Sequence, residues 1–87
     1  MKELLEKAIQ QKLELTNEIE KQMAKDVAQN KLSGITLSKH HLARESFKSA
    51  LTHLVQGKVE DAIYLFSRGC WNLGEFTGRS QKERNLE

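Results

Sequence analysis

An unbroken amphipathic stretch spans residues 1–32, and it constrains the fold of this 87-residue chain more than any other feature. Its apolar positions recur three or four residues apart, which keeps them on one side of an α-helix. They are Leu5, Ile9, Leu13, Ile19, Met23 and Val27, with Thr16 at the one weaker turn. Such a helix is about 45 Å long, so the remainder of the chain, or another molecule, must cover its apolar side.

The composition predicts a small all-α protein. The chain has no proline, which would interrupt helices, and only five glycines. A domain of this size buries only about 60% of the surface of its unfolded chain, so its stability margin is small. The single cysteine, Cys70, excludes an internal disulfide and suits a reducing compartment. With no recognisable signal peptide or membrane-spanning apolar run, we expect a cytoplasmic protein without membrane contacts.

Two shorter helices are predicted to follow, over residues 39–56 and 58–73. The apolar face of the first holds Ala43, Phe47, Ala50, Leu51 and Leu54, and that of the second holds Val59, Ala62, Ile63, Phe66, Cys70 and Leu73. Gly57 separates them, which predicts an antiparallel hairpin. Gly34 is expected just past the end of the long helix, and Thr36 or Ser38 at the N-cap of the next. Residues 1–74 are therefore predicted to form one helical domain, and the polar residues 75–87 a mobile tail.

The two predicted hairpin helices are much shorter than the predicted long helix. At about 27 Å and about 24 Å, the hairpin helices would leave roughly half of the long apolar stripe uncovered. Lys12 and Asp26 interrupt a heptad seam, so a long two-stranded coiled coil is not favoured. We therefore expect a symmetric homodimer that completes the fold. The residues predicted to self-associate are Leu5, Ile9, Leu13, Ile19, Met23 and Val27.

A second apolar line lies on the predicted helix 58–73. Tyr64 and Trp71 are seven residues apart, away from the line of Ala62 and Phe66, and Leu65 adds to it. Tryptophan and tyrosine are enriched where binding energy concentrates. Either these side chains are covered by the long helix or a second chain, or they anchor another protein. The candidate partner-binding residues are Tyr64, Leu65 and Trp71.

The favoured function is a small non-enzymatic protein-interaction module, such as an adaptor, a chaperone-like protein or an inhibitor, which docks a partner through a helical surface. The alternative is a small dimeric regulator that contacts nucleic acid through basic residues of the helix 39–56. Those residues are Lys39, His41, Arg44 and Lys48. A row of cations can neutralise phosphates, but the formal net charge of +2 does not by itself imply nucleic acid.

No catalytic, metal-binding or cofactor-binding residues are predicted, and no cofactor is expected. His40 and His41 are adjacent, so on a helix they point about 100° apart and cannot bind one metal ion together. Cys70 lies on an apolar stripe, where a cysteine usually acts as a small core residue. We therefore do not expect an enzyme.

Residues 46–74 resemble a single tetratricopeptide-type helical hairpin. Ala62, Phe66 and Gly69 reproduce that family's alanine, aromatic, small pattern, with Gly57 at the turn and Ala50 at a small position of the first helix. Ser, Ser and His stand at positions 46, 49 and 53, where the family has Trp, Leu and Tyr. The resemblance covers about a third of the chain and implies a protein-binding scaffold.

Overall fold

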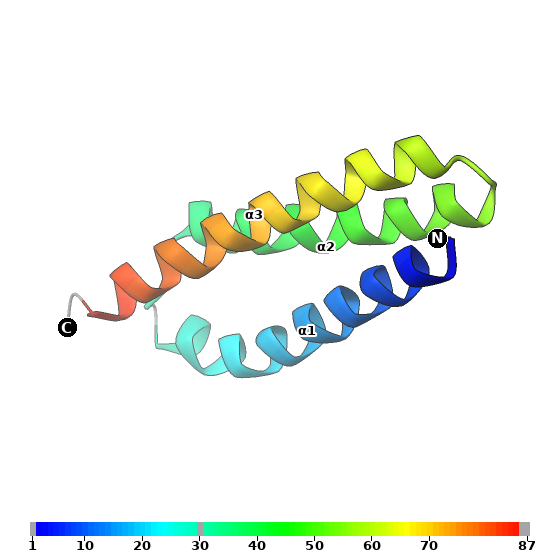
Figure 1. Ribbon diagram of the computed structural model, residues 1–87. Helices are drawn as coiled ribbons and strands as arrows, with labels where there is room; N and C mark the ends of the chain where they lie inside the picture. Colours follow the sequence, from blue (N-terminus) through cyan, green and yellow to red (C-terminus); the bar gives the residue numbers. More distant parts are fainter. Residues whose placement is uncertain (1, 30, 86–87) are drawn as a thin grey trace.

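The computed structural model describes residues 2–29 and 31–85, which form three α-helices. These are α1 (Lys2–Ala28), α2 (Gly34–Val55) and α3 (Val59–Asn85). Helices α2 and α3 lie side by side as an antiparallel hairpin, and α1 runs along it antiparallel to α2 (Figure 1). The molecule is a rod of 46 × 18 × 16 Å. The predicted all-α class with three helices is confirmed.

The hairpin is held by a stripe on each helix whose buried positions alternate three and four residues apart. On α2 these are Thr36, His40, Ala43, Phe47, Ala50 and Leu54; on α3 they are Ala62, Gly69, Leu73, Phe76 and Ser80, with Phe66 half-buried. Gly69 brings the two backbones close together, since a Cβ atom there would lie 2.5 Å from Cε1 of Phe47. The Phe47 ring also packs on Phe66, with ring centroids 5.8 Å apart. Alternating large and small residues thus produce a close helix crossing.

The α2–α3 turn explains why a glycine is needed at position 57. Gly57 has φ 81°, in the left-handed region that other residues rarely adopt. Its N–H donates to the carbonyl oxygen of Leu54 at 3.0 Å, and the N–H of Lys58 donates to that of His53 at 2.8 Å. These are the two hydrogen bonds of a Schellman motif, which satisfies the last carbonyl groups of α2 and reverses the chain.

The connection between α1 and α2 differs from the sequence prediction. Gly34 does not end the long helix with a left-handed residue; it is the first residue of α2. Ser33 is the N-cap, and its Oγ accepts a hydrogen bond from the N–H of Thr36 at 3.3 Å. The predictions for Gly34 and for a cap at Thr36 or Ser38 were therefore wrong. Serine competes well for a cap position wherever the chain enters the helix, and the sequence offered several candidates.

The predicted boundary at residue 74 is also wrong, because α3 continues without a break through residues 75–85. Gly74 and Gly78 each cost about 1 kcal/mol inside a helix, and the residues around them are mostly polar. Phe76 and Ser80 are buried against the other helices, and this packing offsets the glycine penalty. Residues 86–87 of the predicted tail lie outside the described residues.

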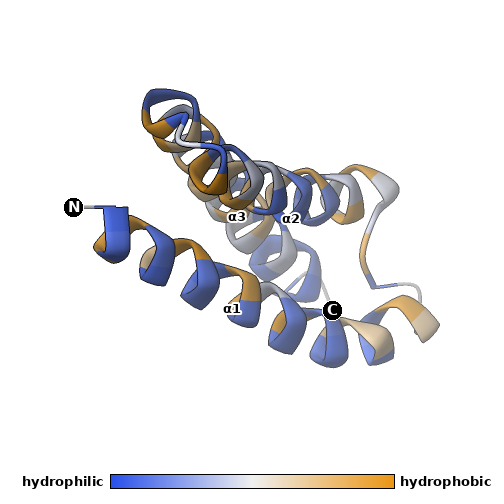
Figure 2. Ribbon diagram, turned by 90° about the vertical axis from the view of Figure 1, so that its right-hand side faces the viewer, coloured by the Kyte–Doolittle hydropathy of each residue, from blue (hydrophilic) through white to orange (hydrophobic). Residues whose placement is uncertain are grey.

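The longer hairpin covers much of the stripe on α1. Ile9, Thr16 and Met23, spaced by seven residues, are buried, with Ile9 and Thr16 completely inaccessible. Leu5, Leu13 and Ile19 are half-buried against the core, and only Val27, at 43% exposure, is open to solvent. In Figure 2 the side of α1 turned away from the hairpin is mainly hydrophilic. The expected uncovered half is absent from the described part of α1, because α2 and α3 are about 33 Å and about 40 Å long.

Candidate functional site

The outer face of α3, opposite the side that packs on α2, carries the most prominent exposed aromatic surface. We call the line along this face the outer seam: Tyr64, Ser67, Trp71, Gly74 and Gly78. The spacings of three, four, three and four residues keep the seam on one side of the helix. Tyr64 is 63% exposed and Trp71 is 56% exposed. The two aromatic side chains identified from the sequence therefore contribute little to the core of the chain.

A cation from the neighbouring helix lies over the exposed indole ring. Nζ of Lys39 in α2 lies 5.1 Å from the centroid of the Trp71 ring. Such a contact contributes about 0.5–1 kcal/mol at an exposed site. Next to the ring, a shallow groove of about 630 Å³ runs past Gly74 and Gly78 to Lys82. A Cβ atom at either glycine would have no neighbour within 4 Å, so the floor of this groove is open.

The third candidate partner residue, Leu65, is placed differently from the two aromatic residues. It is half-buried and packs against the core, so it supports the hairpin more than the outer seam. Ile63, predicted to face inward, is instead 48% exposed. The buried position near it is Ala62, one residue away, and a step of one residue turns a helix by about 100°. The exposure of Tyr64 and Trp71 also shows that the long helix does not cover them, which was one of the two alternatives.

Most of the residues predicted to self-associate serve the chain's own core instead. Ile9 has no accessible surface and Met23 is 9% exposed, so neither presents a docking surface in this structure. Of the remaining four, Leu5, Leu13 and Ile19 keep partial exposure and Val27 is exposed. The structure does not bring this stripe together with the outer seam into one surface, because α1 packs mainly on α2.

The candidate basic residues on α2 are Lys39, His41, Arg44 and Lys48. The two lysines and the arginine each have a partner within the chain. Arg44 forms an ion pair with Glu20 of α1, and Nζ of Lys48 lies 3.7 Å from a carboxylate oxygen of Glu45. The remaining lysine lies over the Trp71 ring. His41 is exposed, and within the described part of the chain its side chain makes no hydrogen bond or ion pair. The charges available to phosphate groups are therefore fewer than the sequence suggests.

The three histidines and Cys70 do not assemble into a site. His40 of α2 is buried with its ring on Phe76 of α3, and its Nε2 donates a hydrogen bond to the carbonyl oxygen of Thr16 in α1 at 3.2 Å. His53 contacts the carbonyl oxygen of Ser49 one turn earlier in its own helix. Cys70 is a half-buried free thiol packed against the core. Among residues 2–29 and 31–85, no three metal-ligating side chains gather where they could bind a metal ion.

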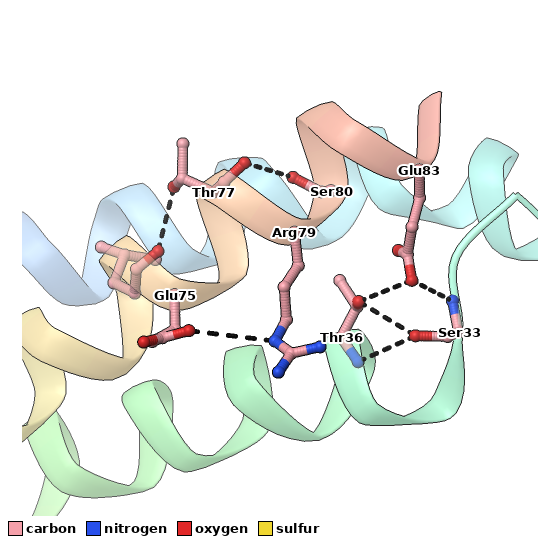
Figure 3. A network of polar contacts seen from close by, with 8 residues as sticks. Ser33, Thr36, Glu75, Thr77, Arg79, Ser80 and Glu83 are labelled. Atoms are coloured by element: carbon pink, nitrogen blue, oxygen red, sulfur yellow. Dashed lines mark hydrogen bonds and ion pairs between the residues drawn. The ribbon is translucent and has the colours of Figure 1, made fainter. Parts of the chain in front are cut away.

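A polar network that sequence analysis missed joins the end of α3 to the start of α2 (Figure 3). Oε1 of Glu83 accepts hydrogen bonds from Oγ1 of Thr36 at 2.9 Å and from the N–H of Ser33 at 3.3 Å. Hydrogen bonding by Ser33, with contributions from Thr36 and the Arg79 guanidinium, holds the pKa of Glu83 below its ordinary value, although partial burial opposes the shift. A carboxylate at a helix N-terminus also interacts favourably with the helix dipole.

This network could have been found from one sequence signal. On α3 the buried positions continue at intervals of three or four residues through Phe76 and Ser80, and the half-buried Glu83 follows at the same spacing, beyond Gly74 and Gly78. If the spacing of three or four residues is followed past Gly74, it predicts that the last turns of α3 also face α2. The partners Ser33 and Thr36 could not be assigned in this way. They precede Glu83 by 50 and 47 residues, and no local pattern connects positions that far apart in the sequence.

Comparison with protein-family models, with curated proteins and with solved structures finds no match for this chain. Function must therefore be argued from the surface itself. Ala62 and Gly69, which carry the tetratricopeptide-type resemblance, lie at the close α2–α3 crossing, where helix packing selects small residues. Over the described residues, none of the helices combines the length and hydropathy of a bilayer-spanning segment.

Proposed function

We propose that this protein is a small, non-enzymatic interaction module that docks another protein chain on the outer seam of α3. The observation that supports this proposal is the exposure of Tyr64 and Trp71 on the side of α3 opposite the buried stripe. Burying one large aromatic side chain contributes about 1.5–3 kcal/mol, and these two lie two helical turns apart. An aromatic surface that the fold does not use is available for a partner.

The character of the partner follows from the shape of this surface. Two aromatic side chains and an open glycine floor lie along one helix, and this arrangement suits a helix or an extended segment that packs lengthwise. Trp71 is positioned by the Lys39 ammonium group, so part of the entropy cost of ordering its side chain is met before binding. The module would thus act by presenting α3, with α1 and α2 as its support.

Affinity capture with matched variants tests this function. Trp71→Ala removes the central aromatic side chain of the outer seam, and Val55→Ala is the control, because Val55 is 72% exposed but lies on α2 next to the turn. We expect a partner that binds wild type and Val55→Ala but not Trp71→Ala, while circular dichroism shows equal helix content. The captured chain must then bind the purified protein with the same dependence on Trp71.

Two results would contradict the proposal. If capture is unaffected by Trp71→Ala and Tyr64→Ala, the outer seam is not the docking surface. If binding is instead lost with Arg44→Glu and Lys48→Glu, falls steeply with salt and is reproduced by generic DNA or RNA, the basic face of α2 carries the function.

A further inference from the structure

The exposed exterior of α3 carries a charge pattern that the packing of the chain does not explain. Asp61, Arg68, Glu75 and Lys82 follow one another at intervals of seven residues, with charges that alternate in sign. Seven residues are close to two helical turns, so all four lie along one flank of the outer seam. Asp61, Arg68 and Lys82 are exposed and Glu75 is half-buried. We call these four residues the charged flank.

When two copies of α3 run antiparallel, the charges of one charged flank are opposite in sign to those that they face on the other. In an antiparallel pair of α3 helices related by a two-fold axis, the same flank of each copy meets. With the axis at Trp71, Asp61 of one copy comes within one residue of the position opposite Lys82 of the second, and Arg68 within one residue of the position opposite Glu75. Each of these pairs occurs twice across the axis, which gives four attractive contacts. Electrostatic complementarity of this kind fixes register and excludes other partners.

The outer seam fits the same register. Trp71 would face Trp71 of the second copy at the axis, and Tyr64 would lie opposite Gly78. A large side chain on an open glycine is the arrangement that allows two helices to approach closely. The helices α1 and α2 lie on the other side of α3 (Figure 1). The Lys39 side chain reaches from α2 to the Trp71 ring, so the second copy must pack beside it or displace it.

We infer that the chain that docks on the outer seam is a second copy of this protein, bound through α3 in an antiparallel, two-fold symmetric dimer. The inference rests on the proposed function and names its partner. Asp61, Arg68 and Lys82 have no ion-pair partner within the described part of the chain, so their charges are available. Glu75 makes one contact within α3, with Nε of Arg79 at 3.8 Å, and that pair is open to solvent.

The first experiment measures self-association of the wild-type chain. Trp71 is the only tryptophan and would lie at the two-fold axis, so its emission reports directly on the interface. We expect the emission to shift to shorter wavelength as the concentration rises from below 1 micromolar to several hundred micromolar, while sedimentation shows a change from monomer to dimer. A wild-type chain that stays monomeric over this range overturns the inference.

The second experiment tests register and orientation by charge exchange. In Arg68→Glu both Arg68–Glu75 contacts become repulsive, and in Glu75→Arg they do so with opposite sign, so each variant alone should dimerise about tenfold more weakly. Mixed together, the two variants place opposite charges at both contacts and should recover the wild-type affinity as a heterodimer. Lys48→Glu is the control, since it makes the same change of charge on α2.

The outcomes separate this inference from the proposed function. Loss of association in both single variants, with recovery only in the mixture, supports the antiparallel pairing. A dimer that is indifferent to these substitutions, or single variants that do not recover on mixing, overturns it. If the wild type stays monomeric but still captures a different protein through Trp71, the self-pairing fails and the proposed interaction function stands.

Discussion

The two helix interfaces of this molecule differ in the kind of side chains that they bury. Between α2 and α3, apolar side chains interlock around Phe47 and Gly69, close enough that no Cβ atom would fit at the glycine. Between α1 and the hairpin, the buried positions include Thr16 and His40, which meet in a hydrogen bond. Ion pairs at two further points join α1 to α2 and α3.

This difference implies a difference in local stability. Apolar burial and close packing are the largest favourable terms in folding, whereas a typical hydrogen bond contributes a net 0.5–1.5 kcal/mol, roughly, and an exposed ion pair about 0.2–1 kcal/mol. The hairpin should therefore be the stable unit of the fold. Helix α1 should open more readily, as a separate cooperative segment. The predictions below test that contrast, beginning with the largest effect.

Phe47→Ala should be the most damaging substitution. The ring is completely buried between Gly69 and Phe66, so its loss leaves a cavity at the centre of the hairpin. Removal of a buried phenylalanine ring costs about 3–5 kcal/mol. Urea titration followed by circular dichroism should show the midpoint of the main loss of helix moving to lower urea, because α1 has no support once the hairpin unfolds. A loss below about 1 kcal/mol would show that the hairpin is not the stable unit.

The same substitution at two glycines of α3 should have opposite effects. Gly69→Ala places a Cβ atom against the Phe47 ring, and this overpacking should destabilise the hairpin by about 1–3 kcal/mol. The higher helix propensity of alanine offsets about 1 kcal/mol of that loss. Gly74→Ala meets no neighbouring atom and should stabilise the protein by about 1 kcal/mol. Thermal melts at low concentration measure both. Equal shifts in the two variants would contradict the close crossing.

Ile9→Val should loosen α1 without affecting the hairpin. It removes one buried methylene group, which costs about 0.5–1.5 kcal/mol. If α1 opens on its own, hydrogen exchange should accelerate in residues 2–28 while amide protection in α3 stays unchanged. Uniform acceleration through all three helices would mean that the molecule opens as one unit.

Glu83→Gln should weaken the open end of the hairpin in a pH-dependent way. Because the pKa of Glu83 is lowered in the folded state, the ionised carboxylate adds stability that is present above the pKa of the unfolded chain. That stability is lost as the pH falls through the lower folded pKa. Wild type should therefore be more stable than the variant at pH 7, and urea titrations should show the difference shrinking as the pH falls below the ordinary carboxyl pKa. A difference that is constant with pH would exclude the carboxylate as its cause.

Asp26→Asn should have the smallest effect. Arg84 donates to Oδ2 of Asp26 from Nε at 3.0 Å and from Nη2 at 2.5 Å, and this pair ties the end of α1 to the end of α3. Ion pairs near the surface contribute about 0.2–1 kcal/mol and weaken as salt screens them. Stability measured at low and at high salt should differ in wild type more than in the variant. An effect as large as that of Ile9→Val would mean that charge, and not apolar burial, holds α1.

Much of the local structure could be predicted from the sequence. The spacing of Ile9, Met23, Phe47 and Leu54 identified their helices and their buried sides, because a period near 3.6 residues specifies one face of a helix. Gly57 marked the turn between α2 and α3 for a reason that is local as well, its positive φ. The exposed aromatic residues of α3 were also identified as lying off the buried line.

The errors came from the same local reasoning, applied where distant contacts decide. Gly74 and Gly78 weaken a helix in isolation, and nothing near them in the sequence shows that Phe76 and Ser80 pack against other helices. The short helices that followed from this error left the stripe on α1 uncovered, which led to the prediction of a dimer through α1. In the structure α2 is longer than predicted and α1 packs mainly on it, so the chain itself covers Ile9 and Met23.

The sequence by itself determined that this chain is helical, that it turns at Gly57 and which side of each helix is apolar, because these properties depend on residues within one or two helical turns. The tertiary structure alone decided how far α3 runs and that Glu83 caps α2 through Ser33 and Thr36. It also decided that the seam of Trp71 faces outward while the stripe of Ile9 faces inward. Both faces are recognised in the sequence by the same spacing of apolar residues. Which of them is buried depends on whether another helix packs against it in three dimensions.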